Sequence, residues 1–169
     1  MQKSIIHTSL FIIQIIIMAV NVEDIKKLRE ETGAGIADCR EALEESQGNL
    51  EEAKKIIKKK GLNKAVSKSD RETGAGVIET YSHGGRVGVL VELLCETDFV
   101  AKTEDFKTLA HELALQVASM RAENSEEILK QEYVRDPSMT VDDLIKGVIG
   151  KVGENIKVGR ISRIELGKE

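Results

Sequence analysis

The sequence has 169 residues, a net charge of -4 and only 3% aromatic residues. A chain of this length holds one ordinary domain, or a small module joined to a modest core, and excludes two large lobes around an enzyme cleft. The charge and the few aromatic side chains argue against a protein that coats nucleic acid. The two cysteines, Cys39 and Cys95, are far apart and form no Cys-His cluster, which favours a reducing compartment and predicts no metal site.

The first 17 residues contain an apolar run, residues 10–17, that is too short to span a bilayer. A secretory signal would need a basic start and a small-residue cleavage site, but Lys3 is the only basic residue here. We therefore expect Met18 to be the natural start, and residues 1–17 to be an upstream extension or a disordered leader. A signal or anchor segment is the alternative.

Residues 18–61 show three short helical patterns. Asn21 can cap the first helix, and Gly61 is the expected end of the third. Apolar residues recur at helical spacing at Val22, Ile25, Leu28, Ile36, Cys39, Leu43, Leu50, Ala53, Ile56 and Ile57. Three helices in about forty residues make a bundle near the lower limit of independent stability, so we expect a docking module and not a reaction site.

The connecting segment, residues 62–75, continues a predominantly basic stretch that begins at Lys54. The apolar pattern fades after Leu62, which is typical of a solvated linker. Contact with an acidic protein surface or with RNA is the alternative, and salt would screen such contact.

Residues 76–169 predict an α+β core. Strands are expected at residues 76–81 and 86–94, joined by a turn at Gly84 and Gly85, and a third strand at residues 156–166. Helical patterns cover residues 103–120 and run from Thr140 to Gly153, separated by a polar stretch that contains Pro137. The expected architecture is a three-stranded antiparallel sheet with its helices packed on one side.

The corner between the second strand and the first long helix, residues 97–100, places Asp98 beside Phe99. An exposed Phe at such a connection can anchor a partner protein and offers roughly 1.5–3 kcal/mol on burial. The other interpretation is that Phe99 packs under its own helix, and spacing alone favours it.

Two features of the sequence suggest an enzyme at first, a glycine-rich stretch and the histidines, but neither has the residues that a catalytic or nucleotide-binding site needs. Residues 147–152 superficially resemble a phosphate-binding loop but lie within a helical pattern and lack the required Ser or Thr. His7, His83 and His111 lie in separate sequence contexts, and the sequence places no Ser, Cys or carboxylate beside them as a catalytic triad. We therefore expect a binding protein and no enzyme.

Four motifs in a fixed order carry a resemblance to a known family. They are KLREETGAG at residues 27–35, DCREAL at 38–43, ETDFVA at 96–101 and GENI at 153–156. In this order they resemble translation elongation factor Ts, in a short form, over roughly residues 22–167.

The resemblance implies a guanine nucleotide exchange factor for elongation factor Tu that promotes GDP release and needs no cofactor. It also implies that residues 18–61 are similar to a ubiquitin-associated (UBA) bundle. The implied exchange tip, which would enter the GTPase near its magnesium site, is Thr97, Asp98, Phe99 and Val100. Expected docking residues of the amino-terminal module are Lys27, Leu28, Arg29, Thr32 and Gly33. Arg86 and Asn155 are further candidates that either contact the partner or stabilise the core.

The chain departs from the family pattern in three ways. It holds one core half where long members have two, so we expect a homodimer to replace the missing contacts. The stretch 121–139 is shorter than the family's helical insertion, and residues 158–161 lack the usual basic and aromatic pattern. These departures leave a non-exchanging binding or chaperone module as the alternative function. No direct contact with nucleic acid or a membrane is expected. The expected location is the cytoplasm, and an organellar stroma or matrix is the alternative.

Overall fold

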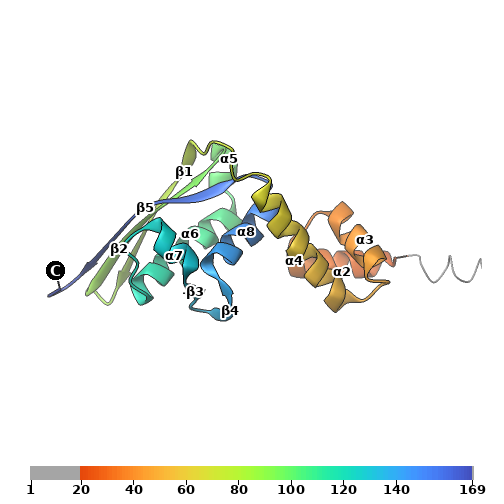
Figure 1. Cartoon of the computed structure of the whole chain (residues 1–169), viewed down its shortest axis with the longest axis horizontal. Helices are drawn as coiled ribbons and strands as arrows, with labels where there is room; N and C mark the ends of the chain where they lie inside the picture. The colour runs from red at the N-terminus through yellow and green to blue at the C-terminus, as the bar shows by residue number, and fades with distance from the viewer. Residues whose placement is uncertain (1–19, 169) are drawn as a thin grey trace, which may run out of the picture. The chain divides into compact units, whose positions relative to one another are not determined.

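A computed structural model describes residues 20–168 of the chain (Figure 1). The predictions for residues 1–17, Met18 and His7 lie outside the described residues. The described residues divide into two compact units, 20–60 and 61–168. None of the helices in the described range is long and apolar enough to cross a membrane.

The first unit contains α2 (Val22–Thr32), α3 (Ile36–Glu45) and most of α4 (Leu50–Val66). As predicted, Asn21 caps α2, because its side chain accepts a hydrogen bond from the backbone N–H of Glu23. A core of small and aliphatic side chains joins the helices: Leu28, Cys39, Ala42, Leu43 and Ala53. From residue 20 to residue 66 the structure has three helices, as predicted, while the likeness to a UBA bundle stays a prediction.

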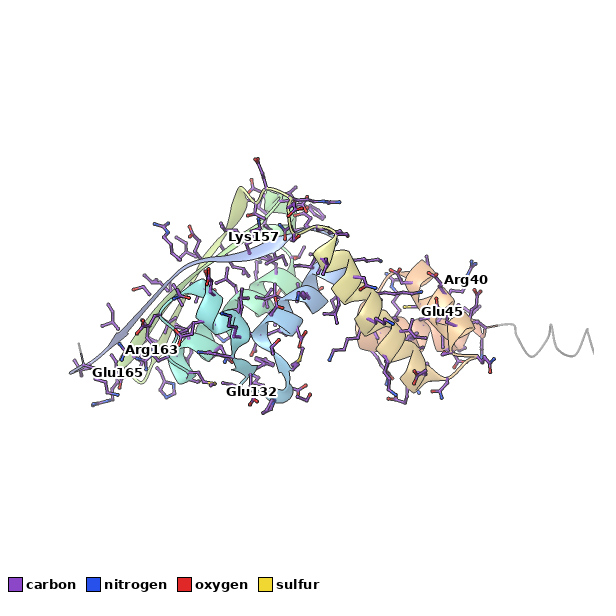
Figure 2. The ribbon with its side chains drawn as sticks, in the orientation of Figure 1. Arg40, Glu45, Glu132, Lys157, Arg163 and Glu165 are labelled. Atoms are coloured by element: carbon purple, nitrogen blue, oxygen red, sulfur yellow. The ribbon has the colours of Figure 1, made fainter. Side chains whose placement is uncertain are left out.

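Several basic residues of α4 are used within the first unit. The Lys60 Nζ lies 3.1 Å from a Glu41 oxygen and 3.0 Å from a Glu45 oxygen, and Figure 2 labels Glu45 on α3. The Lys54 Nζ lies 2.6 Å from a Glu31 oxygen of α2. Such pairs add little stability at a surface, but they neutralise part of the positive stretch that the sequence presents.

The prediction that Gly61 ends the third helix is wrong, because α4 continues to Val66. Gly61 lies instead where α4 meets α8 (Val141–Val152), and a Cβ atom at Gly150 would lie 2.8 Å from the Gly61 Cα. Ala65, in the expected linker, is buried in the core of the second unit. Gly61 thus allows α4 and α8 to pack closely. Its local sequence does not distinguish this role from that of a glycine that ends a helix.

Two glycines of α8 should respond in opposite ways to replacement by alanine. We expect Gly150→Ala to destabilise the second unit by about 1–3 kcal/mol, because the new methyl group meets the backbone of Gly61. Gly147→Ala is the matched control: a Cβ there meets nothing, so the better helix propensity should stabilise by about 0.5–1 kcal/mol. Thermal denaturation of both variants is the measurement, and equal effects would contradict the close helix contact.

The second unit is built on the antiparallel sheet that the sequence predicts. Strands β1 (Ala75–His83), β2 (Val87–Cys95) and β5 (Ile156–Glu165) pair in the order β1-β2-β5. Figure 1 shows α6 (Glu104–Ser119) and α8 together on one face of this sheet. Side chains from that face and from the helices form the core, with Val91, Leu93, Phe106 and Leu113 fully buried.

A bulge interrupts the pairing of β2 with β5 between Val91 and Leu93. The Glu92 carboxylate covers it and accepts hydrogen bonds from the backbone N–H of Arg160 at 3.0 Å and from its guanidinium at 3.1 Å. This guanidinium contact, with the backbone bond, lowers the pKa of Glu92 to about 2. A side chain at Gly159 would collide with the Glu92 carboxylate. Strand pairing therefore survives the unusual sequence of residues 158–161, as expected.

Four short elements were not predicted: α5 (Asp98–Ala101), α7 (Ser125–Lys130), β3 (Glu132–Tyr133) and β4 (Asp136–Thr140). The last three occupy the stretch expected to be merely polar. The buried side chain of Gln116 in α6 holds them: it accepts from the Val134 N–H at 2.9 Å and donates to the Glu132 carbonyl at 3.0 Å. Elements this short depend on such tertiary contacts, which a local pattern does not contain.

Candidate partner-binding site

The corner between β2 and α6 forms a single helical turn, α5, that presents one aromatic side chain. Thr97 caps this turn, because its hydroxyl accepts a hydrogen bond from the Val100 N–H. Val100 and Ala101 are 4% and 5% exposed and anchor the turn in the core, whereas Phe99 is 81% exposed. The interpretation in which Phe99 packs under its own helix is therefore wrong. Its ring is available to a partner.

A carboxylate from another part of the chain holds the start of this corner. Glu154, which follows α8, accepts hydrogen bonds from the Thr97 N–H at 3.0 Å and from the Thr97 hydroxyl at 2.7 Å. In return, the Glu96 carboxylate accepts the Asn155 N–H at 2.7 Å. The β2–α5 and α8–β5 junctions thus each donate to a carboxylate of the other. This brings together two motifs that lie more than fifty residues apart in the sequence.

The side chain of Asn155 is buried, and its amide nitrogen makes two hydrogen bonds. Its amide nitrogen donates to the backbone carbonyls of Ser69 at 3.2 Å and Arg71 at 2.8 Å. The Lys68 ammonium also donates to the carbonyl of Gly153. The segment that follows α4 is therefore attached to the α8–β5 junction, and of the two roles considered for Asn155, the structure supports stabilisation of the core.

The neighbours of Glu96 and Cys95 determine the direction in which the pKa of each group is shifted. The Asn155 N–H, and next the charge of Arg71, keep the pKa of Glu96 below its ordinary value, so this carboxylate stays ionised. Burial raises the pKa of the Cys95 thiol, which donates to the Thr97 carbonyl at 3.2 Å. Burial likewise raises the pKa of Cys39. Both cysteines are core residues, as their isolation in the sequence indicates.

Sequence comparisons place this geometry in a family. A sequence model described as Elongation factor TS matches residues 96–169, which include the corner and Glu154. The chain is also 41% identical to Elongation factor Ts of Thermotoga neapolitana, over 90% of this chain and 100% of that protein. This chain belongs to the elongation factor Ts family. The predicted resemblance is confirmed, and with it a place among translation elongation factors.

Two further relatives show how members of the elongation factor Ts family differ in length. Elongation factor Ts of Coprothermobacter proteolyticus is 42% identical over 89% of this chain and 100% of its own length. That of Aquifex aeolicus is 46% identical over 88% of this chain but only 53% of its own length. The Thermotoga neapolitana alignment spans 196 residues, more than the 169 present here, so that relative contains residues without a counterpart in this chain.

In this elongation factor Ts chain, the five expected docking residues of the first unit have different environments. Lys27 and Arg29 are exposed on α2. Leu28 is fully buried in the core, which favours a packing role, and its prediction as a contact residue stays a prediction. Thr32 is half-buried and its hydroxyl donates to the Leu28 carbonyl at 2.6 Å, while Gly33, with φ 67°, ends the helix. Of the five residues, Lys27 and Arg29 are the ones whose long side chains are exposed and can contact a partner.

Two exposed apolar side chains of the first unit were overlooked. Val22 is 62% exposed and Ile36 is 57% exposed, although both were assigned to the apolar faces of their helices. Each lies at the first position of its helix, where fewer neighbouring turns are present to cover a side chain. The sequence did contain a signal for this exposure. Asn21 and Gly35 are the N-cap residues, so Val22 and Ile36 fall at the first positions of α2 and α3.

Arg86 lies at the opposite end of β2 from the corner. It is exposed in the turn between β1 and β2, and its carbonyl accepts the Leu166 N–H at 2.8 Å. A nine-residue strand separates it from Glu96, a distance of about 30 Å. The structure therefore does not bring Arg86 together with the corner, and its role as a partner contact stays a prediction.

The histidines and the glycine-rich stretch belong to other parts of the fold. The Nδ1 of His83 lies 3.1 Å from the Tyr81 hydroxyl, and that of His111 lies 3.3 Å from a Glu79 oxygen. Residues 147–152 are helical within α8, as expected. Across residues 20–168, no group of three or more His, Cys, Asp or Glu side chains is placed to hold a metal ion.

Proposed function

We propose that this protein is a guanine nucleotide exchange factor for elongation factor Tu and promotes GDP release during translation elongation. The observation that carries the proposal is Phe99, which is 81% exposed on a turn whose neighbours, Val100 and Ala101, are buried. A large apolar side chain held out from a fixed backbone is suited to enter a pocket of another protein. Membership of the elongation factor Ts family supports elongation factor Tu as that protein.

The corner would act as a wedge near the magnesium site of the GTPase. Phe99 supplies apolar surface and the exposed Asp98 supplies a carboxylate, which together would loosen the metal ion and the phosphate loop. The factor contributes no covalent chemistry. It binds GDP-bound and nucleotide-free forms of the GTPase and stabilises the latter more strongly.

The energetic requirement sets what the wedge alone can achieve. The exchange protein and GDP must lower each other's affinity for the GTPase by the same ratio. Every tenfold loss of affinity corresponds to ~1.4 kcal/mol. Burial of Phe99 offers roughly 1.5–3 kcal/mol, which is one or two decades. The first unit, through exposed Lys27 and Arg29 and its UBA-like bundle, would supply the docking energy that holds the corner in place.

A binding or chaperone module without exchange activity is the second candidate. The observation that favours it is the length of the Thermotoga neapolitana alignment, which exceeds the length of this chain. If the missing residues make partner contacts, the shortened core docks without opening the nucleotide site. A homodimer would offset that loss through a second copy, and the cytoplasm or an organellar equivalent is the proposed location.

Release of a fluorescent GDP analogue from the cognate elongation factor Tu separates the two functions. An exchange factor accelerates release in proportion to its concentration until the GTPase is saturated, and substoichiometric amounts turn over many GTPase molecules. A docking module binds, as titration calorimetry would show, but leaves the release rate unchanged. Unchanged release at micromolar protein would reject the exchange function.

A further inference from the structure

Thr97, the cap of α5, gives both of its polar hydrogens to one residue. The Glu154 Oε2 accepts the backbone N–H, and the Glu154 Oε1 accepts the hydroxyl hydrogen. Hydrogen bonds to an ionised carboxylate are roughly twice as strong as neutral ones. We propose that Glu154 is a positioning residue for Phe99, acting through Thr97, an inference that rests on the exchange function proposed above.

The hydroxyl of Thr97 explains how Glu154 acts on the turn. A Thr hydroxyl has one hydrogen and two lone pairs. Because the hydrogen points to Glu154, a lone pair remains for the Val100 N–H, and this bond caps α5. Without that acceptor the hydroxyl could turn its hydrogen toward the Val100 N–H, and in that orientation it no longer accepts from Val100. Glu154 therefore fixes both the position of Thr97 and the orientation of its cap.

The turn needs this support because α5 has only four residues. A helix of this length has no stability of its own and keeps its shape through caps and tertiary contacts. Val100 and Ala101 hold its carboxyl-terminal half in the core. Phe99, largely exposed, contributes no packing that would fix its own direction. The amino-terminal half, which carries Asp98 and Phe99, thus depends on Thr97 and Glu154.

Glu154 is itself placed by neighbours outside the corner. Gly153, with φ 80°, ends α8 in the left-handed conformation and turns the chain toward β5. Lys68 donates to the Gly153 carbonyl, and the Asn155 N–H on the other side is held by Glu96. Residues on both sides of Glu154 are therefore fixed, so its carboxylate meets Thr97 in one geometry.

Glu154→Gln is the sharpest variant, because it keeps the size of the side chain. Its single carbonyl oxygen can accept one of the two Thr97 hydrogens. Its NH₂ group then faces either the backbone N–H, which cannot accept, or the hydroxyl, which must turn its hydrogen away to accept. We expect the maximal rate of GDP release at saturating factor to fall about three- to tenfold, since small misplacements of a working group cost that much or more. The half-saturating concentration should change less than about twofold, because the first unit still docks.

The control is Glu126→Gln on α7, an exposed glutamate whose loss removes the same charge elsewhere in the second unit. It should leave the maximal rate of release unchanged. Thermal denaturation of both variants shows whether either fails to fold. If Glu126→Gln slows release as much as Glu154→Gln, the effect is one of net charge and the positioning role is overturned.

Two measurements distinguish positioning from general stabilisation. In a Phe99→Ala background, Glu154→Gln should slow release less than twofold further, because it acts through Phe99. Equal fold losses in both backgrounds, or a normal rate for Glu154→Gln alone, would overturn the inference. Amide hydrogen exchange in the free protein should rise at Thr97 and Val100 in Glu154→Gln and not in Glu126→Gln; unchanged exchange would also overturn it. Failure of the exchange function shows differently, as a wild-type protein that does not accelerate GDP release.

Discussion

Replacement of Phe99 by alanine is expected to slow the maximal release of GDP from elongation factor Tu by roughly ten- to a hundredfold. The estimate is the loss of about 1.5–3 kcal/mol of apolar burial, converted at ~1.4 kcal/mol per decade. Thermal stability should stay unchanged, because the ring is 81% exposed and contributes almost nothing to the core. Stopped-flow measurement with a fluorescent GDP analogue gives the maximal rate and the half-saturating concentration together.

The control for this variant is Val134→Ala. Val134 is 45% exposed and lies outside the corner, between β3 and β4, so its truncation should leave the rate of GDP release unchanged. Combining Asp98→Ala with Phe99→Ala should reduce the maximal rate further, while the half-saturating concentration stays within about threefold. A double variant that exchanges normally would show that the corner is not the working part of the molecule.

Leu28→Ala is expected to unfold the first unit while the second unit stays folded. Leu28 is fully buried in a core of five small and aliphatic residues, and such a truncation costs about 2–5 kcal/mol. A bundle of about forty residues has little stability to lose. Chemical shifts of the two units, followed by NMR during heating, would report each unit separately. Docking on elongation factor Tu should weaken with the loss of the first unit.

Lys27→Ala and Arg29→Ala are the matched controls, because both side chains are exposed on the same helix as Leu28. They should leave the unfolding of the first unit unchanged and weaken docking in a salt-dependent way. Leu28→Met, which conserves volume, should cost less than about 1.5 kcal/mol. If Leu28→Ala left the stability of the first unit intact while weakening docking, Leu28 would be a contact residue after all.

The regular elements could be predicted because their patterns are long and local. Helix α6 buries a stripe of apolar side chains, and Gly153 ends α8 at the residue where its stripe stops. The prediction that Gly61 ends the third helix was wrong for a physical reason. A glycine that ends a helix and a glycine that permits close packing look alike in sequence. The partner that decides between them, Gly150, is 89 positions away. The short elements around Gln116 depend on similarly distant contacts.

The candidate site was predictable in position but not in construction. The corner falls between a strand and a helix, so the sequence places it correctly. Whether Phe99 faces inward or outward depends on Val100 and Ala101 taking the buried positions, which spacing within one turn leaves open. The bonds from Thr97 to Glu154 join residues 57 positions apart. The burial of Leu28 was predictable, because its helical spacing with Ile25 already indicated the core.

The central claim is that a fixed corner of the second unit opens the nucleotide site of elongation factor Tu. A structure of the full chain bound to nucleotide-free elongation factor Tu tests it most directly. The account predicts that Phe99, 81% exposed in the free protein, is buried between elements of the nucleotide-binding domain, with the Thr97 bonds to Glu154 retained. A complex in which Phe99 still faces solvent, away from the GTPase, would contradict it.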